Sequence, residues 1–267
     1  MTDRRDALAA LRNRLARMGQ GDSPRASRIF SLGLPMVDGP LGGGLARAAL
    51  HEVFARTPPD GTAAIGFGLI LAILAAQERP VVWIRQDFAD VEGGRLHAPG
   101  LVELGRDPSS LVLVRARDAA GVLRAALEAV RCPAVGAVGL EPWGEPGVLD
   151  LTATRRLSLA AAASGVAAFL VRAAARPEPS SAATRWSVAA APSRALLANA
   201  PGQPAFAISL LRHRAGLPAR DWHVEWDRDR CSFQDGAALP RAVVPVSADR
   251  PDQVASAPAA PGWRRAG

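Results

Sequence analysis

The amino-acid sequence predicts an α/β fold, a doubly wound, mostly parallel sheet with helices on both faces. Three observations lead to this class. Short apolar runs alternate with longer helical segments between residues 48 and 171, which is the order of a parallel sheet with crossover helices. The runs lack the alternation of half-exposed strands, so we expect them to be covered on both faces. Prolines and glycines separate the segments, as they do between regular elements.

An amphipathic helix is the first predicted element, within residues 3–18. Its apolar side chains recur at steps of three, four and three residues, with arginines among the other positions. These side chains are Leu8, Leu11, Leu15 and Met18. We expect this narrow apolar seam either to pack on the chain's own domain or to bind a partner. A polar linker at residues 19–28 follows it.

A strand, a loop, a helix and a second strand come next. The first strand is predicted at residues 48–54, the loop at 55–61 and an apolar helix at 62–77. Pro80 ends this helix, and the second strand spans residues 81–84. The same order then repeats, with a helix end at residues 100–104, strands at 111–114, 135–140 and 167–171, and helices at 119–130 and 149–164.

The last part of the core is predicted to add a β-meander at the sheet edge. Apolar Trp222, Val224 and Trp226 alternate with polar neighbours, as in a half-exposed strand. Residues from about 237 onward are rich in Ala, Pro, Ser and Asp, which predicts disorder. The meander strands are expected at residues 185–189, 205–212 and 222–226, after a break at 177–183. The predicted parts are an N-terminal helix and linker (1–28), a core with C-terminal strands (29–236) and a disordered tail (237–267).

Composition narrows the class of protein. The formal net charge is +7 and its positive part is arginine alone, which favours an acidic partner, either nucleic acid or an acidic protein face. Cys132 and Cys231 are too few for a disulfide framework, and the four histidines lack metal-ligand spacing. We therefore expect a cytoplasmic protein with neither metal nor cofactor. The uncharged segments 61–77 and 157–171 are too short to span a membrane and are predicted to be buried helices.

The loop before the first predicted helix stands where a nucleotide-binding protein has its phosphate loop, but it lacks the necessary residues. A working loop needs glycines, a lysine that reaches the phosphates and a hydroxyl that binds magnesium. Here Pro58 and Pro59 remove two backbone donors, Asp60 adds a negative charge, and no lysine follows Gly61. The degenerate loop at Gly61 and Thr62 is therefore predicted to be a structural turn, with weak nucleotide binding as an alternative. Thr62 could cap the helix.

The chain resembles the RecA core over roughly residues 30–175. The resemblance rests on Asp38, the glycine turn 42–44 and Glu52 before the phosphate loop, followed by the run 104–107 and the helix after it. It implies a RecA-like fold. In that frame Glu141 stands where a RecA ATPase has its magnesium-ordering Asp, and Asp87 stands near its water-activating glutamate. Without the lysine, neither is expected to be catalytic, so we predict no catalytic residue.

Within the RecA superfamily the chain is similar to the ImuA family, the accessory proteins of the bacterial damage-inducible mutagenesis cassette. The resemblance implies a non-catalytic accessory or scaffold role in error-prone translesion synthesis during the SOS response. It also implies two partners, an ImuB-type Y-family adaptor and an error-prone C-family DNA polymerase, with RecA and DNA as further candidates. The runs that carry it are residues 101–107, 114–118, 137–144, 154–157, 184–186, 210–214 and 224–226.

Arginines near the predicted strand and helix ends are the candidates for nucleic-acid contact. Arg185 precedes Trp186, whose indole could stack on a base. Two alternatives to the scaffold role therefore stay open, a DNA-binding module that modulates RecA filaments or primer ends and a nucleotide-sensing regulator that retains ATP affinity. The candidate arginines are Arg115, Arg117, Arg155, Arg156, Arg172 and Arg185.

Overall fold

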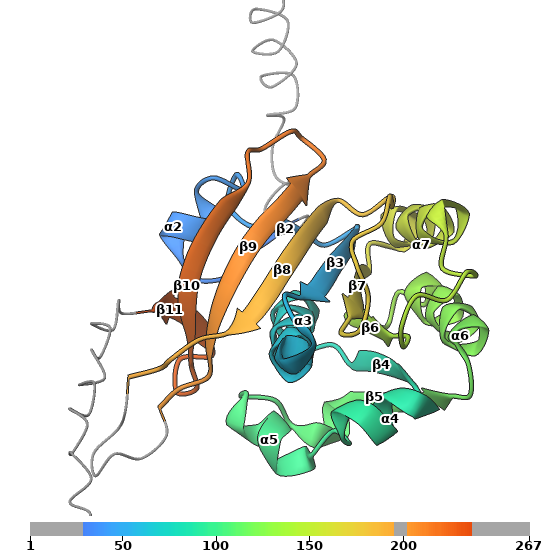
Figure 1. The fold of residues 1–267 in the computed structure, drawn as a ribbon, viewed down its shortest axis with the longest axis horizontal. Helices are drawn as coiled ribbons and strands as arrows, with labels where there is room; N and C mark the ends of the chain where they lie inside the picture. The colour runs from blue at the N-terminus through green and yellow to red at the C-terminus, as the bar shows by residue number, and fades with distance from the viewer. Residues whose placement is uncertain (1–28, 195–201, 237–267) are drawn as a thin grey trace, which may run out of the picture.

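A nine-stranded sheet organises the computed structural model, which describes residues 29–194 and 202–236 (Figure 1). Its strands lie in the order β11-β10-β9-β8-β3-β7-β6-β4-β5. The pairs from β8 through β5 are parallel, and those from β8 through β11 are antiparallel. The predicted α/β class with a mostly parallel sheet is confirmed. The predicted N-terminal helix with its seam, and the predicted disordered tail, lie outside the described residues.

The central parallel strands are covered on both faces, as their unbroken apolar runs predict. The prediction is wrong for the edge strand β5, where Val112 is 50% and Leu113 43% exposed. In β4, Val81 and Trp83 belong to the core on one face of the sheet, whereas Val82 and Ile84 belong to the core on the other. Such a strand cannot show apolar and polar alternation, because neither face meets water. The parallel strands are β3 (Leu50–Ala55), β4 (Val81–Gln86), β5 (Leu111–Ala116), β6 (Ala137–Glu141), β7 (Ala167–Arg172) and β8 (Thr184–Ala190).

Helix α3 (Gly61–Ala76) packs on one face of the sheet, and α6 (Ala119–Arg131) and α7 (Leu151–Ser164) pack on the other (Figure 1). The predicted buried helix at 61–77 is thus confirmed. The segment 157–171 is not a buried helix throughout, because Gly165 adopts a left-handed conformation (φ 77°) that ends α7 before β7 begins. The helix predicted at 149–164 and the strand predicted at 167–171 are confirmed. The predicted helix end at residues 100–104 belongs to α5 (Ala98–Glu103), which follows the short helix α4 (Asp87–Gly93).

Helix α3 is apolar on all sides because protein surrounds it. Phe67 lies 6.2 Å from Trp186, 5.8 Å from Phe206 and 5.6 Å from Phe233, measured between ring centroids. On the sheet side, a Cβ at Gly68 would lie 2.6 Å from a Val171 methyl carbon, so only glycine permits this close approach. The segment Pro58–Ala76 is long and apolar enough to cross a membrane, but 61% of it is buried inside the protein. It is therefore best explained as a core helix.

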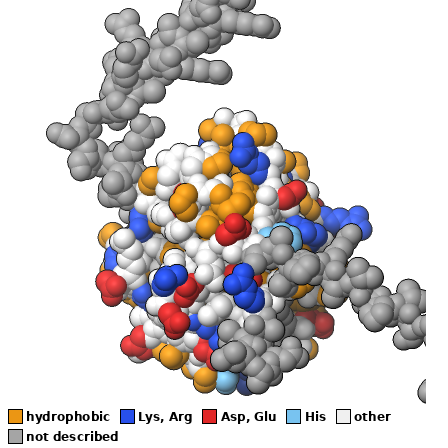
Figure 2. Space-filling model, turned by 90° about the vertical axis from the view of Figure 1, so that its left-hand side faces the viewer, with side chains coloured by type: hydrophobic (Ala, Val, Ile, Leu, Met, Phe, Trp, Pro, Cys, Tyr) orange, Lys and Arg blue, Asp and Glu red, His pale blue; other side chains and the backbone are white. Residues whose placement is uncertain are grey.

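The C-terminal strands form the predicted meander at the sheet edge. They are β9 (Ala205–His213), β10 (Arg220–Asp227) and a short strand, β11 (Ser232–Asp235), that the sequence pattern did not predict. Trp222, Val224 and Trp226 are buried, as their alternation predicts. On the face of the molecule at this edge, several hydrophobic side chains lie together, and acidic and basic side chains lie around them (Figure 2).

The segment before β3 is a compact entry loop organised by one buried carboxylate. Asp38, in the short helix α2 (Pro35–Asp38), accepts hydrogen bonds from the Ser31 hydroxyl (2.6 Å) and from the backbone N–H groups of Leu32 (2.9 Å), Gly33 (3.1 Å) and Leu34 (3.2 Å). The glycine turn then joins β1 (Ile29–Phe30) to β2 (Leu45–Ala46). Gly44 (φ 136°) is required there, because a Cβ would lie 2.1 Å from the Phe30 carbonyl oxygen.

Candidate functional site

The predicted phosphate loop lies at the sheet edge where the parallel strands end. Strand β3 ends at Ala55, and a one-turn 3-10 helix, η1 (Pro58–Asp60), leads directly into α3. This is the strand, loop and helix order of a phosphate-binding element. The loop therefore lies between a strand and a helix, as a phosphate loop does. Whether it can bind a phosphate depends on where its polar groups point.

Asp60 occupies the hydrogen-bond donors of this loop with its own carboxylate. Its Oδ2 accepts from the Thr57 N–H (3.0 Å) and the Thr57 hydroxyl (2.6 Å), and its Oδ1 accepts from the Ala190 N–H (3.0 Å) at the end of β8. Burial opposes ionisation, but these bonds outweigh it and lower the pKa of Asp60 below its ordinary value. A side-chain anion thus already lies in the loop and accepts from Thr57 and Ala190.

Arg56, the cation of this loop, does not bind the Asp60 carboxylate. The Arg56 side chain extends to β9, where it donates to the Ser209 hydroxyl (2.9 Å) and the Ala207 carbonyl (3.2 Å). Thr62 is exposed within the first turn of α3, and Asp60 rather than Thr62 holds the N-cap position. The suggestion that Thr62 caps the helix is therefore wrong.

Thr62 instead lines a largely apolar pocket of about 500 Å³ between α3, α5 and β9. Leu69, Leu101 and Phe206 contribute to its walls. The pocket lies on the α3 side of the loop and is built mainly from side chains of the core. Arg85, Arg95 and His97 also line it, and the Arg85 guanidinium is hydrogen-bonded to Glu141.

Glu141, at the end of β6, is held by a buried arginine. The Arg85 guanidinium, at the corresponding level of β4, donates from Nε to Glu141 Oε2 (2.7 Å) and from Nη2 to Oε1 (2.7 Å). The Trp83 indole N–H also donates to Oε2 (3.0 Å). Each of the two charged residues is 1% exposed. The carboxylate at the magnesium-ordering position is therefore fully engaged within the protein.

Arg85 links this pair to a second carboxylate and a second arginine. Its Nη1 contacts Asp90 Oδ1 at 2.6 Å and the Gly94 carbonyl oxygen at 2.8 Å. Asp90 Oδ2 lies 3.3 Å from Nε of Arg115 on β5, and Arg115 also contacts Asp87 at 3.1 Å. Asp87, near the position of RecA's water-activating glutamate, is thus a half-exposed partner of Arg115.

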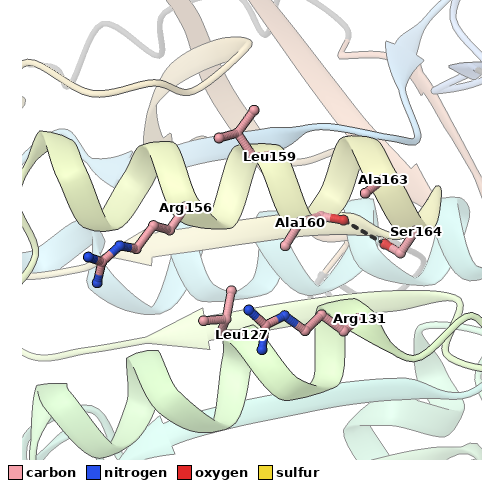
Figure 3. A pocket seen from close by; sticks show the side chains of 7 residues that line it. All are labelled: Leu127, Arg131, Arg156, Leu159, Ala160, Ala163 and Ser164. Carbon is pink, nitrogen blue, oxygen red and sulfur yellow. Dashed lines mark hydrogen bonds between the residues drawn. The ribbon is translucent and has the colours of Figure 1, made fainter.

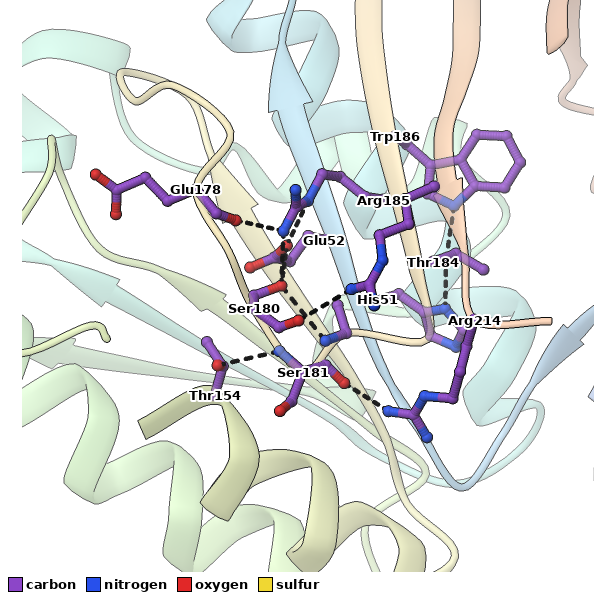
Figure 4. Close-up of polar contacts among 12 residues, drawn as sticks. His51, Glu52, Thr154, Glu178, Ser180, Ser181, Thr184, Arg185, Trp186 and Arg214 are labelled. Carbon is purple, nitrogen blue, oxygen red and sulfur yellow. Dashed lines mark hydrogen bonds and ion pairs between the residues drawn. The ribbon is translucent and has the colours of Figure 1, made fainter. Parts of the chain in front are cut away.

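A second buried ion pair lies across β3 and β8 (Figure 4). Glu52 Oε2 accepts from Arg185 Nε (3.0 Å) and from the Ser180 hydroxyl (2.6 Å). Arg185 Nη2 contacts the Ser180 hydroxyl (2.9 Å) and the Glu178 carbonyl. Only 12% of the Arg185 side chain is exposed. The neighbouring Trp186 is fully buried, so its indole is not a platform for a base.

Arg172 is buried beside this pair at the end of β7. Its guanidinium carbon and that of Arg185 each lie 5.8 Å from the centroid of the Phe54 ring. Its Nη2 donates to the Gly144 carbonyl (3.3 Å), while Nε is buried without a hydrogen-bond partner among the described residues. Burial lowers the pKa of Arg172 from its ordinary value, although nearby carboxylates oppose this.

The six predicted nucleic-acid arginines do not form one groove. Arg172 and Arg185 come together on Phe54, but they are largely buried. Arg115 lies on β5, separated from β7 by β4 and β6, and is paired with carboxylates. The other three, Arg117, Arg155 and Arg156, are exposed. The nucleic-acid role of these arginines stays a prediction.

Sequence reasoning missed Arg85 and Ser180 as members of these networks. A signal for Arg85 was present, because an arginine inside the apolar strand 81–86 must find a buried partner. Ser180 offered no signal, because it lies in the irregular segment between β7 and β8. Within residues 29–194 and 202–236, no three His, Cys, Asp or Glu side chains are grouped so that they could hold a metal ion. The predicted partner seam lies outside these residues.

Known proteins with similar sequences indicate the family to which this chain belongs. No protein-family model matches the chain. Two curated relatives do, both called Protein ImuA, from Caulobacter vibrioides strains NA1000 / CB15N and ATCC 19089 / CIP 103742 / CB 15. Each is 34% identical over 206 residues, which is 71% of this chain and 80% of the relative.

Proposed function

This chain belongs to the ImuA family, and on that premise we propose that it is a non-catalytic accessory protein of damage-induced mutagenesis. In this proposal it acts as a scaffold in error-prone translesion synthesis during the SOS response, in the cytoplasm. Its partners would be an ImuB-type adaptor and an error-prone C-family polymerase, as the resemblance of the sequence implies.

We also infer that the core is a RecA-like domain. The support is the place of the degenerate loop, which follows a central parallel strand and precedes the buried helix α3. Glu52 lies on β3 and Glu141 lies at the end of β6, both in the parallel part of the sheet. Because fold alone does not fix activity, the functional proposal depends on the chemistry of the loop.

One observation carries the non-catalytic assignment, the Asp60 carboxylate in the phosphate loop. It accepts the Thr57 and Ala190 N–H groups, and the chain has no lysine to place beside a triphosphate. A bound phosphate would have to displace an ionised side chain whose charge has the same sign as its own. Glu141 supports the assignment, because a magnesium ion would have to compete with the bidentate Arg85 contact.

Hydrolysis and nucleotide binding test this assignment directly. The purified full chain, with and without single-stranded DNA, is expected to release no phosphate from ATP above a no-protein control. Calorimetry at millimolar ATP should show no binding heat, which would also remove the nucleotide-sensing alternative. Hydrolysis at rates typical of RecA-like enzymes would overturn the proposal.

Association with the mutagenesis machinery tests the scaffold role. Co-expression of the chain with an ImuB-type adaptor should yield a complex that survives size-exclusion chromatography. Cells that lack the gene should show fewer mutations after DNA damage, and the wild-type gene should restore them. Normal damage-induced mutagenesis in the deletion strain would contradict the proposal.

Direct DNA binding is the second candidate, favoured by the exposed Arg117, Arg155 and Arg156. Among the described residues none of the three is in an ion pair, so their charges are available to phosphates. Binding of single-stranded DNA that weakens with salt, and weakens further in the Arg155→Glu/Arg156→Glu variant, would support it. No binding at low salt would remove it.

A further inference from the structure

An open groove of about 530 Å³ lies between α6 and α7, on the face of the sheet opposite α3 (Figure 3). Helix α6 contributes Leu127 and Arg131, and α7 contributes Arg156, Leu159 and Ala163. The groove is formed by two regular helices that are anchored on the sheet by their inner faces. Its shape is therefore set before any partner binds.

Four of the seven residues that line this groove are apolar, namely Leu127, Leu159, Ala160 and Ala163. Leu159 is 61% exposed although its neighbours Leu157 and Ala161 on the same helix are buried. The one hydroxyl that lines the groove, that of Ser164, donates to the Ala160 carbonyl (3.0 Å) and so turns back into its own helix. Leu151, at the start of α7, is a further exposed apolar side chain on this helix. Apolar side chains in such a concave site are typical of a helix-binding groove.

The rim of the groove is positively charged. Within Leu151–Ser164 the charged residues are Arg155 and Arg156, both exposed, and no acidic residue is present. On α6, Arg131 pairs with Glu128 at 3.0 Å, but both side chains are more than half exposed, so solvent screens this pair strongly. Arg124 adds a further exposed positive charge on the same helix. A partner that complements the rim must therefore be acidic.

Charge and shape together decide which kind of ligand fits the groove. Residues 1–28 and 237–267 of the chain each carry more arginine than acidic residues, so neither end complements the rim. Nucleic acid would meet leucines rather than aromatic rings on which its bases could stack. We propose that the α6–α7 groove binds an acidic amphipathic segment of another protein, whose apolar side chains recur at helical spacing. This inference does not depend on the function proposed above.

A peptide selection with the full chain as bait tests the proposal. A random library of roughly 16-residue peptides, about four helical turns, would be selected on the wild-type chain and counter-selected on the Arg131→Glu/Arg156→Glu variant. We expect the recovered peptides to be enriched in Asp and Glu and to carry Leu, Ile or Phe at spacings of three and four residues. Recovered peptides without this enrichment would overturn the proposal, as would a failure to recover any binder.

Affinity measurements with the best recovered peptide locate the site. Fluorescence anisotropy should show at least about a tenfold loss of affinity in Leu159→Asp and in Arg131→Glu/Arg156→Glu. The Arg220→Glu variant, which reverses an exposed arginine on β10, should stay within about twofold of wild type. Equal affinity in all variants would overturn the proposal. So would competition by a single-stranded oligonucleotide that binds the same groove more tightly, which would assign it to DNA.

Discussion

The carboxyl edge of the parallel sheet and the α6–α7 face are both rich in arginine, but they use it in opposite ways. At the sheet edge, Arg85 and Arg185 are buried against Glu141 and Glu52. On the α6–α7 face, Arg156 extends into solvent beside an exposed leucine. The two arginines at the edge are therefore paired inside the protein. On the helical face Arg131 has only the exposed Glu128 as a partner, and Arg156 has no ion pair among the described residues.

This difference shows that an arginine count alone says little about partners. The chain's excess positive charge suggests an acidic ligand, but part of it is paired with the buried carboxylates of Glu52 and Glu141. These arginines are hydrogen-bonded inside the protein. The exposed arginines are then the ones that can contribute to binding.

The largest expected effect comes from breaking the Arg85–Glu141 pair. Glu141→Ala leaves the guanidinium of Arg85 buried with only part of its charge compensated, by Asp90, and should lower the free energy of unfolding by about 3–5 kcal/mol. Urea denaturation measures the change. The double variant Arg85→Met/Glu141→Leu should regain part of the loss, because it removes both charges of the pair and Asp90 keeps its contact with Arg115.

Asp87→Ala is the matched control for that experiment. It removes a carboxylate that is 44% exposed and paired with the half-exposed Arg115, so it should cost less than about 1 kcal/mol. A Glu141→Ala variant as stable as this control would contradict the description of the arginines at the sheet edge as paired inside the protein.

A pH titration tests whether the start of β3 is also closed to solvent, through the buried side chain of His51. Burial lowers the pKa of His51 to about 4, although the bond to the Ala46 carbonyl opposes this. Since the unfolded chain takes up the proton near pH 6.5 and the folded chain does not, stability is complete above that pH and falls between about 6.5 and 4.

The expected loss at His51 is roughly 3 kcal/mol by pH 4. His51→Gln should flatten this part of the stability profile in urea denaturation at a series of pH values. A wild-type profile that stays flat between pH 6.5 and 4 would show that His51 is not held in its neutral form.

A smaller effect is expected at the phosphate loop. Asp60→Ala removes the acceptor for the Thr57 and Ala190 N–H groups and should cost about 1 kcal/mol, as loss of a helix cap does. Thermal unfolding measures it. The variant should still not hydrolyse ATP, because no lysine is present; hydrolysis would mean that Asp60 alone suppresses the activity.

The smallest effect is expected on the α6–α7 face. Arg131→Glu/Arg156→Glu should change the free energy of unfolding by less than about 0.5 kcal/mol, because both side chains are exposed. The same thermal unfolding assay measures it. A large destabilisation would mean that these arginines hold the two helices together, and the contrast between the two regions would then disappear.

Much of the fold can be predicted from the sequence, whereas the ion-pair and hydrogen-bond networks of the candidate site cannot. Apolar runs such as residues 81–84 and the glycine at position 165 mark strands and helix ends locally. The Arg85–Glu141 contact joins residues 56 positions apart, and no local pattern specifies the register that brings them together. The same holds for Asp60, whose charge was noticed in the loop but whose Ala190 partner lies 130 positions away. Strand β11 was missed because Phe233 is its only apolar residue, so no apolar run or alternation marks it.

The environment of α3 also has a consequence for synthesis of the chain. Phe206 and Phe233, which cover this helix, are made about 130 and 157 residues after its last residue, Ala76. At a synthesis rate of roughly 5–20 residues per second, this apolar helix stays uncovered for on the order of ten seconds before the strands that bury it are made. Ribosome-bound chains that stop before β9 should therefore recruit chaperones more strongly than chains that extend past β11, and truncation ahead of β9 should yield an aggregating product.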